Sequence, residues 1–267
     1  DGKCDTVTMM SYGMDPYLMS WSPYHGAEYA VLTSVAKIVS AGGDFHKIRF
    51  TFQEYFKRMT EDAKRWGEPM AALLGAYDAQ IKLGLPSIGG KDSMSGTFND
   101  IDVPPTLCSF AVDVAEISDV VTNELKKAGS CLVKFTIQKD EYDLPDFAFI
   151  MSQYEKITKL MRDGVIRSAQ AVDGNGVADA VAKMAFGNKI GAKFCKHKPK
   201  EYFFTPGYGE IVAEIDEEDL AVLDVAGVSY DKIGKTLDKP QFECADEVIS
   251  MEEALSAWRG TLEKVFP

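Results

Sequence analysis

Apolar residues recur at helical spacing in the first part of the chain. Between His25 and Gly42, residues such as Ala30, Val35 and Ile38 fall on one face of a helix with 3.6 residues per turn. The pattern stops at a pair of glycines, which commonly follow the last turn of a helix. The sequence therefore predicts one long helix over this stretch.

A different pattern, with a period of two, runs from Thr106 to Val114 and predicts a strand. Proline fits the first turn of a helix, so Glu68-Pro69 predicts the start of a helix that runs to Gly84. The other elements expected in this part are strands over 6–12 and 48–52 and a helix over 53–66.

The composition changes near Glu116, and we place a domain boundary there, between residues 1–116 and 117–267. The second part alternates strands and helices, which is typical of an α/β fold. The elements predicted in it are a strand near 131–137, a helix near 147–162, a strand or loop near 165–172, a helix near 177–186, a strand near 210–214, a helix near 217–225, a strand near 228–233 and a closing helix over 251–265.

Composition narrows the class of protein. The 267 residues include 29 basic and 41 acidic side chains, giving a net charge of -12, which argues against a nucleic-acid partner. An anionic ligand must therefore meet a local site. Five scattered cysteines without a C-x-x-C pair favour reduced thiols in a cytoplasmic protein over disulfides or structural zinc. No apolar run approaches the roughly 18 residues of a membrane span, so we expect no membrane partner.

The clearest candidate chemistry lies in a glycine-rich segment predicted to be a loop. Gly89 and Gly90 would let a ligand approach the backbone closely, and Lys91, Asp92 and Ser93 offer a cation, a hard oxygen ligand and a hydroxyl. These residue types suit a phosphate with a divalent cation. A polar turn between a helix and a strand would use the same residues, so both interpretations stay open at this point.

Other segments make weaker candidates. Asp173 to Gly176 precedes a predicted helix and offers amide groups to an anion, but a capped helix start uses the same residues and is favoured. Thr205 to Gly209 is typical of a turn that also lets a ligand approach the backbone. The three histidines are separated from one another and form no catalytic arrangement on sequence grounds.

Six segments along the chain together match one enzyme family. They are Asp15-Pro16-Tyr17, His25-Gly26-Ala27, Gly84 to Ser95, Val103-Pro104-Pro105-Thr106, Lys183 to Phe186 and Ala257 to Leu262. With them the chain resembles phosphoribosylformylglycinamidine synthase, and within it the second of two aminoimidazole-ribonucleotide-synthase-like (AIR-synthase-like, or PurM-like) halves. The resemblance spans essentially the whole chain. It implies an α/β (α+β) fold, with an N-terminal domain incomplete at its start and a C-terminal α/β domain, in a piece of a longer enzyme.

The resemblance also implies an activity. In this family ATP phosphorylates the amide oxygen of formylglycinamide ribonucleotide, and ammonia from glutamine displaces the phosphate to give the amidine, a step of purine biosynthesis. The implied cofactors are ATP and Mg²⁺. The implied partners are the first AIR-synthase-like half and a glutaminase domain of the same enzyme.

The family's Gly-Gly-Asn-x-Ser loop assigns roles to the glycine-rich segment. Carried over by position, ATP and phosphate contacts fall on Gly89, Gly90 and Lys91, and the substrate contact falls on Ser93. Lys91 cannot ligate a metal while protonated, so it would contact phosphate instead, and Asp92 becomes the candidate metal ligand.

Three positions depart from the family pattern. Thr33 and Lys37 stand where large family members hold magnesium with a Glu and an Asn, and Ala171 replaces the first acid of an Asp-x-Ser-Asp-Gly-Gly signature. We therefore expect this half to lack a second nucleotide with its magnesium cluster. The family's catalytic histidine and nucleophilic cysteine have no counterpart, so we expect no catalytic residue and no complete activity from this chain alone. It would supply one wall of the synthetase site.

Two alternatives from other classes stay open. One is a scaffold half whose nucleotide site has decayed. The other is a free-standing kinase of the same superfamily, similar to thiamine-monophosphate kinase or selenophosphate synthase. The missing acids argue against the second alternative, because such enzymes need several aspartates for metal-bound ATP.

Overall fold

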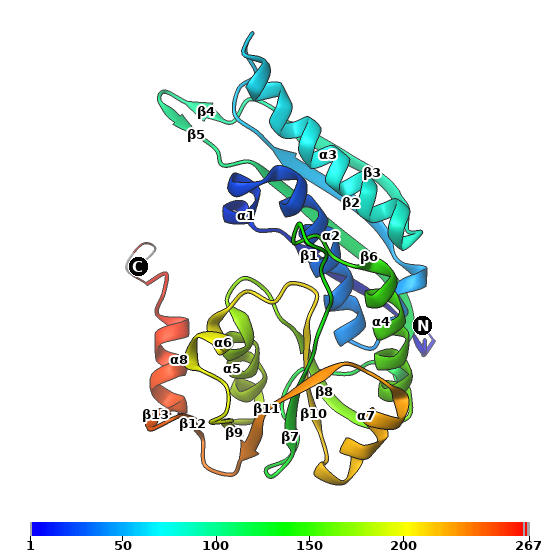
Figure 1. Ribbon diagram of the computed structural model, residues 1–267, viewed down its shortest axis with the longest axis vertical. Coiled ribbons are helices and arrows are strands. Elements are labelled where there is room, and N and C mark those ends of the chain that lie inside the picture. The colour runs from blue at the N-terminus through cyan, green and yellow to red at the C-terminus, as the bar shows by residue number, and fades with distance from the viewer. Residues whose placement is uncertain (1, 264, 266–267) are drawn as a thin grey trace. The chain divides into compact units, whose positions relative to one another are not determined.

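The chain folds into two compact units, seen here in a computed structural model that describes residues 2–263 and residue 265 (Figure 1). The first unit comprises Asp1–Val120 and Ile137–Thr158, and the second comprises Val121–Thr136 and Lys159–Pro267. The sequence predicts a single boundary after residue 116. The structure instead divides the chain at several points, because the segment from Ile137 to Thr158 returns to the first unit. None of the described helices is long and apolar enough to cross a membrane.

The first unit is a four-stranded sheet with helices on one face. Its strands follow the order β1-β6-β2-β3, and only β2 and β3 are parallel. Its described elements are β1 (Thr6–Gly13), α1 (Pro16–Trp21), α2 (Pro23–Ser40), β2 (Arg49–Tyr55), α3 (Ala63–Leu83), β3 (Ser87–Ser93), the short pair β4 (Thr97–Phe98) and β5 (Ile101–Asp102), β6 (Thr106–Glu116), and α4 (Phe147–Arg162) as far as Thr158.

Helix α2 covers the centre of this sheet, as its apolar spacing predicts. Ser34 on α2 lies 2.9 Å, between hydroxyl oxygens, from Ser109 on β6, and Ser11 on β1 donates to the Ser34 carbonyl oxygen at 2.6 Å. The strand predicted over 106–114 is confirmed within β6. Its alternate residues, including Ser109 and Ala111, are fully buried on the face that α2 covers.

The helix expected over 53–66 is wrong, because β2 continues to Tyr55 and α3 begins only at Ala63. Strand β2 pairs with β6 on one side and β3 on the other, so its backbone groups are satisfied as a strand. The Asp62 carboxylate caps α3 by accepting from the Lys64 amide at 3.0 Å. Pro69 consequently lies inside α3 and does not begin a helix.

The second unit is a seven-stranded, mostly antiparallel sheet in the order β13-β12-β9-β11-β7-β10-β8. Its described elements are β7 (Cys131–Phe135), β8 (Ile166–Ala171), α5 (Gly176–Asn188), β9 (Gly191–Phe194), α6 (Lys200–Phe204), β10 (Ile211–Ile215), α7 (Leu220–Ala226), β11 (Tyr230–Leu237), β12 (Gln241–Cys244), β13 (Glu247–Ser250) and α8 (Met251–Arg259), with the last turn of α4.

Helix α5 carries the core of the second unit. Its buried residues, such as Val181 and Met184, pack against Leu132, Val212 and Ile233 from three strands of the sheet. The sequence does not predict β9, α6, β12 and β13, which are only four or five residues long and so show little periodicity. The closing helix expected over 251–265 is wrong in its end, because α8 stops at Arg259; residue 264 lies outside the described residues.

Candidate functional site

The glycine-rich segment is a strand, so the expectation of a loop there is wrong. Ser87–Ser93 forms β3, which pairs with β2 on one side and lies at the edge of its sheet. Six of its seven residues are exposed, and Ser93 is half-buried. An edge strand offers unpaired backbone N–H and C=O groups to a ligand. The segment therefore remains accessible, in a different conformation from the one its glycines suggest.

Strand geometry separates the site residues between two faces. Lys91 lies opposite Gln53 and Ser93 lies opposite Tyr55 in the register with β2. Successive side chains of a strand point to opposite faces, so these four residues share one face and Asp92 faces the other way. On the shared face, the Tyr55 hydroxyl donates to the Gln53 Oε1 atom at 2.7 Å. This face is the one that α2 leaves open.

Asp92 instead lies opposite Glu54, on the side of the sheet that the helices cover. Glu54 is only 2% exposed, and neither of its carboxylate oxygens has a hydrogen-bond partner in the part of the chain that the structure describes. Burial, together with the negative charge of Asp92, raises the pKa of Glu54 to about 8. The two carboxyl groups form an acidic pair at this edge of the sheet.

The two glycines of β3 differ in what surrounds them. A Cβ atom on Gly90 would lie 2.9 Å from the carbonyl oxygen of Phe52, so strand packing favours glycine there. A Cβ atom on Gly89 would meet nothing within 4 Å. Gly89 therefore leaves space beside the backbone of β3.

The positions that depart from the family pattern carry no carboxylate or amide side chain. The Lys37 ammonium donates to the Tyr12 carbonyl oxygen at 2.9 Å and lies 4.3 Å from the centre of the Tyr12 ring. Thr33 is buried on the same helix, and Ala171 is buried in β8 of the second unit. Within residues 2–263 and 265, no three His, Cys, Asp or Glu side chains come together as a metal site.

Several residues of the matched segments have structural contacts. Asp15 caps α1 by accepting from the amides of Tyr17 at 2.8 Å and Leu18 at 3.1 Å. The His25 ring nitrogens lie 2.8 Å from the Ser22 hydroxyl and 2.9 Å from the carbonyl oxygen of Tyr142. These contacts account for local conformation without requiring a ligand.

The two folded units have the AIR-synthase-like (PurM-like) fold. The structure of PurL from Thermotoga maritima complexed with FGAR aligns with 91% of this chain, and the aligned part is 44% of the PurL chain. The TM-score is 0.73 and the sequence identity is 13%. The structure of thiamine-monophosphate kinase from Stenotrophomonas maltophilia also aligns with 91% of this chain, and the aligned part is 85% of the kinase chain. The TM-score is 0.60 and the sequence identity is 9%. At such identities the likeness concerns the fold.

In sequence, the chain is similar to the PurL subunit of phosphoribosylformylglycinamidine synthase. The subunit from Pelagibacter ubique is 27% identical over 202 residues, which are 65% of this chain and 27% of that protein. The subunit from Thermus thermophilus is 22% identical over 230 residues, covering 77% and 32%. No protein-family model matches the sequence. The chain spans about a third of the length of these curated relatives, and the resemblance and the fold expected from its motifs are confirmed.

Sequence reasoning missed the residues that β2 contributes to the candidate site. The sequence predicts a helix for Gln53, Glu54 and Tyr55, because the apolar and polar alternation of Phe50 to Gln53 breaks at Glu54, where an apolar residue would continue it. The local sequence therefore carries no strand signal for Glu54 and Tyr55. Their pairing with β3 depends on tertiary structure and leaves no mark in the local sequence.

Proposed function

We propose that this chain is the second AIR-synthase-like half of a phosphoribosylformylglycinamidine synthase. In that role it contributes to the ATP- and glutamine-dependent conversion of formylglycinamide ribonucleotide to the amidine, in the cytoplasm. The observation that carries the proposal is the sequence similarity to PurL over 77% of the chain. PurL structures in complex with FGAR and with ATP, which share the fold, support it.

In this proposal the open face of β3 binds the phosphate end of a ligand. The Lys91 ammonium offsets negative charge on phosphate oxygens, and the Ser93 hydroxyl donates a hydrogen bond to the substrate. Gly89 shares this face and leaves space for the ligand beside the backbone, whereas Gly90 faces the covered side, so its proposed contact with ATP would be through its backbone at the edge of the sheet. Phosphoryl transfer depends mainly on positioning and charge stabilisation, so a wall with these groups contributes without holding a catalytic base.

Asp92, with Glu54 beside it, is the pair we propose for Mg²⁺. Carboxylate oxygens are the ligands that Mg²⁺ prefers, one or two of them suffice when water and phosphate complete the shell, and those of Glu54 are buried without a partner among the described residues. The residues therefore fit the ion. When bound, Mg²⁺ neutralises charge on phosphate oxygens. Because Asp92 and Lys91 face opposite sides of the sheet, Asp92 would not share a ligand with Lys91 on the open face.

The open face of the first unit also suits the proposed partner, the first AIR-synthase-like half. Met10 is 71% exposed and Tyr12 is at least half exposed on β1, and Val114 is half exposed on the neighbouring strand β6. Contiguous exposed apolar patches mark protein interfaces. With this face covered by the other half, Lys91 and Ser93 would contact their ligand across the interface. The glutaminase domain is the second proposed partner.

Replacing Lys91 with alanine in the complete enzyme is expected to lower the rate of amidine formation by about tenfold or more, because one charge facing the phosphate is lost. Lys47→Ala is the matched control, since Lys47 is an exposed lysine of the same unit, well away from β3 in the sequence. Steady-state kinetics with saturating glutamine measure both variants. Activity of Lys91→Ala within twofold of the wild type would remove this segment from the synthetase site.

We expect no magnesium-dependent binding of ADP at the second nucleotide site of this half. The ammonium group of Lys37 repels a cation where the family has an amide, and Thr33 and Ala171 supply no carboxylate. Isothermal titration calorimetry of this chain with ADP, with and without Mg²⁺, measures this directly. Micromolar affinity that requires Mg²⁺ would contradict the expectation.

A free-standing kinase is the second candidate, and one observation favours it. The chain covers 85% of the thiamine-monophosphate kinase structure but only 44% of the PurL structure. ATP-dependent phosphorylation of thiamine monophosphate by this chain alone would support the kinase, whereas the proposed synthase half has no such activity.

A further inference from the structure

We propose that a cavity in the second unit binds a small, uncharged heteroaromatic molecule that carries an N–H donor. The cavity has a volume of about 540 Å³ and lies among α5, α6, β9, the β12–β13 hairpin and α8. Ligand sites usually measure about 300–1,000 Å³. The cavity is distinct from the β3 site, because every residue that lines it belongs to the second unit and β3 belongs to the first. Its lining includes Gly174 and Asn175, from the segment that corresponds to the Asp-x-Ser-Asp-Gly-Gly signature.

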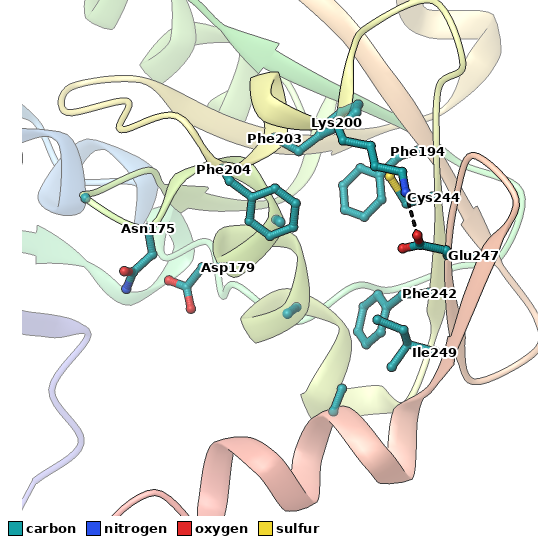
Figure 2. A pocket seen from close by; sticks show the side chains of 14 residues that line it. Asn175, Asp179, Phe194, Lys200, Phe203, Phe204, Phe242, Cys244, Glu247 and Ile249 are labelled. Atoms are coloured by element: carbon teal, nitrogen blue, oxygen red, sulfur yellow. Dashed lines mark hydrogen bonds and ion pairs between the residues drawn. The ribbon is translucent and has the colours of Figure 1, made fainter.

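Aromatic rings form the walls of the cavity (Figure 2). Phe194 and Phe203 have ring centres 4.7 Å apart at an angle of 49°, and Phe242 and Phe204 complete the aromatic lining. Small residues on the helices, such as Ala254, leave the space between these rings open. Aromatic pairs prefer offset or edge-to-face contact at such distances, so a flat ring is the shape that these walls fit best.

The mouth of the cavity exposes large apolar side chains. Phe204 is 63% exposed and Ile249 is 44% exposed, although both line the cavity. Removing such apolar surface from water is favourable. A ligand that fills the cavity covers both side chains, which provides the driving force for binding.

Polar groups on two sides of the cavity determine which aromatic molecule fits. Asp179 and Asn175 lie on one side, and Lys200 and Glu247 lie on another (Figure 2). The carboxylates are each bonded to a lysine, at 2.6 Å for Asp179 with Lys183 and at 2.5 Å for Glu247 with Lys200. The pairs balance charge, which disfavours a strongly charged ligand.

These carboxylates also favour a ligand that donates hydrogen bonds. A carboxylate has about four lone-pair sites, and a lysine bond occupies one of them. The remaining sites on Asp179 and Glu247 accept N–H groups at the edge of a ring. Nucleobases and indoles share this chemistry, with a flat apolar body and N–H donors at the edge.

Indole and 1-methylindole are the probes that test the proposal, because 1-methylindole has a methyl group in place of the N–H donor. We expect indole to bind this chain with a dissociation constant below about 1 mM, and 1-methylindole to bind at least threefold more weakly. Ligand-observed NMR and isothermal titration calorimetry measure both. No saturable binding of indole up to that concentration, or equal affinity for the two probes, would overturn the proposal.

Two alanines on α8 give a matched pair of variants. Ala254 lines the cavity and Ala257 is exposed on the same helix. Ala254→Phe is expected to weaken indole binding by about tenfold because it fills the space, and Ala257→Phe is expected to leave binding unchanged. Equal loss in both variants would place the binding elsewhere.

If Ala254→Phe does not fold, Phe204→Ala tests the proposal in its place. Because the Phe204 ring is mostly exposed, its removal leaves the core intact. We expect about fivefold weaker indole binding in this variant, with an unchanged circular dichroism spectrum. Unchanged affinity would contradict a ligand held under this ring.

Discussion

Alanine in place of Gly75 is expected to destabilise the chain by about 2 kcal/mol, because a well-packed contact has no room for a methyl group. A Cβ atom at Gly75 on α3 would lie 2.2 Å from the carbonyl oxygen of Tyr24, at the start of α2. That oxygen belongs to the backbone, so relief requires a shift of one helix against the other. Thermal and urea denaturation, followed by circular dichroism, measure the change.

Gly67→Ala is the control for this prediction, because Gly67 lies in the same helix and a Cβ atom there would meet nothing within 4 Å. Alanine is favoured over glycine in a helix interior by up to about 1 kcal/mol, so this variant is expected to be slightly more stable than the wild type. The two substitutions should therefore have opposite signs. Equal effects would show that helix propensity, and not the approach of α3 to α2, governs position 75.

Glutamine in place of Glu54 is expected to stabilise the first unit at pH 8 by a few kcal/mol, and much less at pH 5. Glu54 has a folded-state pKa of about 8 against an ordinary value of 4.5, so the folded chain keeps a proton that the unfolded chain releases. Stability is therefore lost as pH rises from about 4.5 to about 8. The amide removes this loss and can donate to the Asp92 carboxylate.

Chemical denaturation at pH 5 and pH 8 measures this difference. Glu61→Gln, in the exposed loop before α3, is the control and should change neither value. Glu28 has the same raised pKa of about 8 from burial, so some pH dependence should persist in the Glu54 variant. At pH 8, Mg²⁺ should stabilise the wild type and not Glu54→Gln if the acidic pair binds the ion. Destabilisation of Glu54→Gln at pH 8 would mean that the ionised carboxylate is favourable where it lies.

The sequence predicts much of the fold where an element is long and buries one face against the core. The helix expected near 147–162 matches α4, and the strand over 106–114 lies within β6. The helix expected over 53–66 fails because polar and aromatic residues suit either structure, and pairing with two neighbouring strands decides for β2. Local propensity contains no information about such neighbours.

The residue types of the candidate site could also be read from the sequence. The residue types from Gly89 to Ser93 predict phosphate chemistry, and the roles of these residues stay a proposal. Its conformation was not foreseen, because a parallel partner strand holds the glycines extended. The Glu54–Asp92 pair joins residues 38 positions apart, and the aromatic cavity joins β9, α6 and β12.

The sequence by itself determined the chemistry that this protein has available: the family resemblance, the lysine and hydroxyl of the glycine-rich segment, and the residue types at the positions where the resemblance implies magnesium ligands. Only the tertiary structure decided which face of the sheet each of these side chains lies on. Strand alternation places Lys91 and Ser93 on the open face and Asp92 with Glu54 on the other, since neighbours along a strand point in opposite directions. Which face is open follows from where α2 packs, and packing between distant segments is a property of the folded chain.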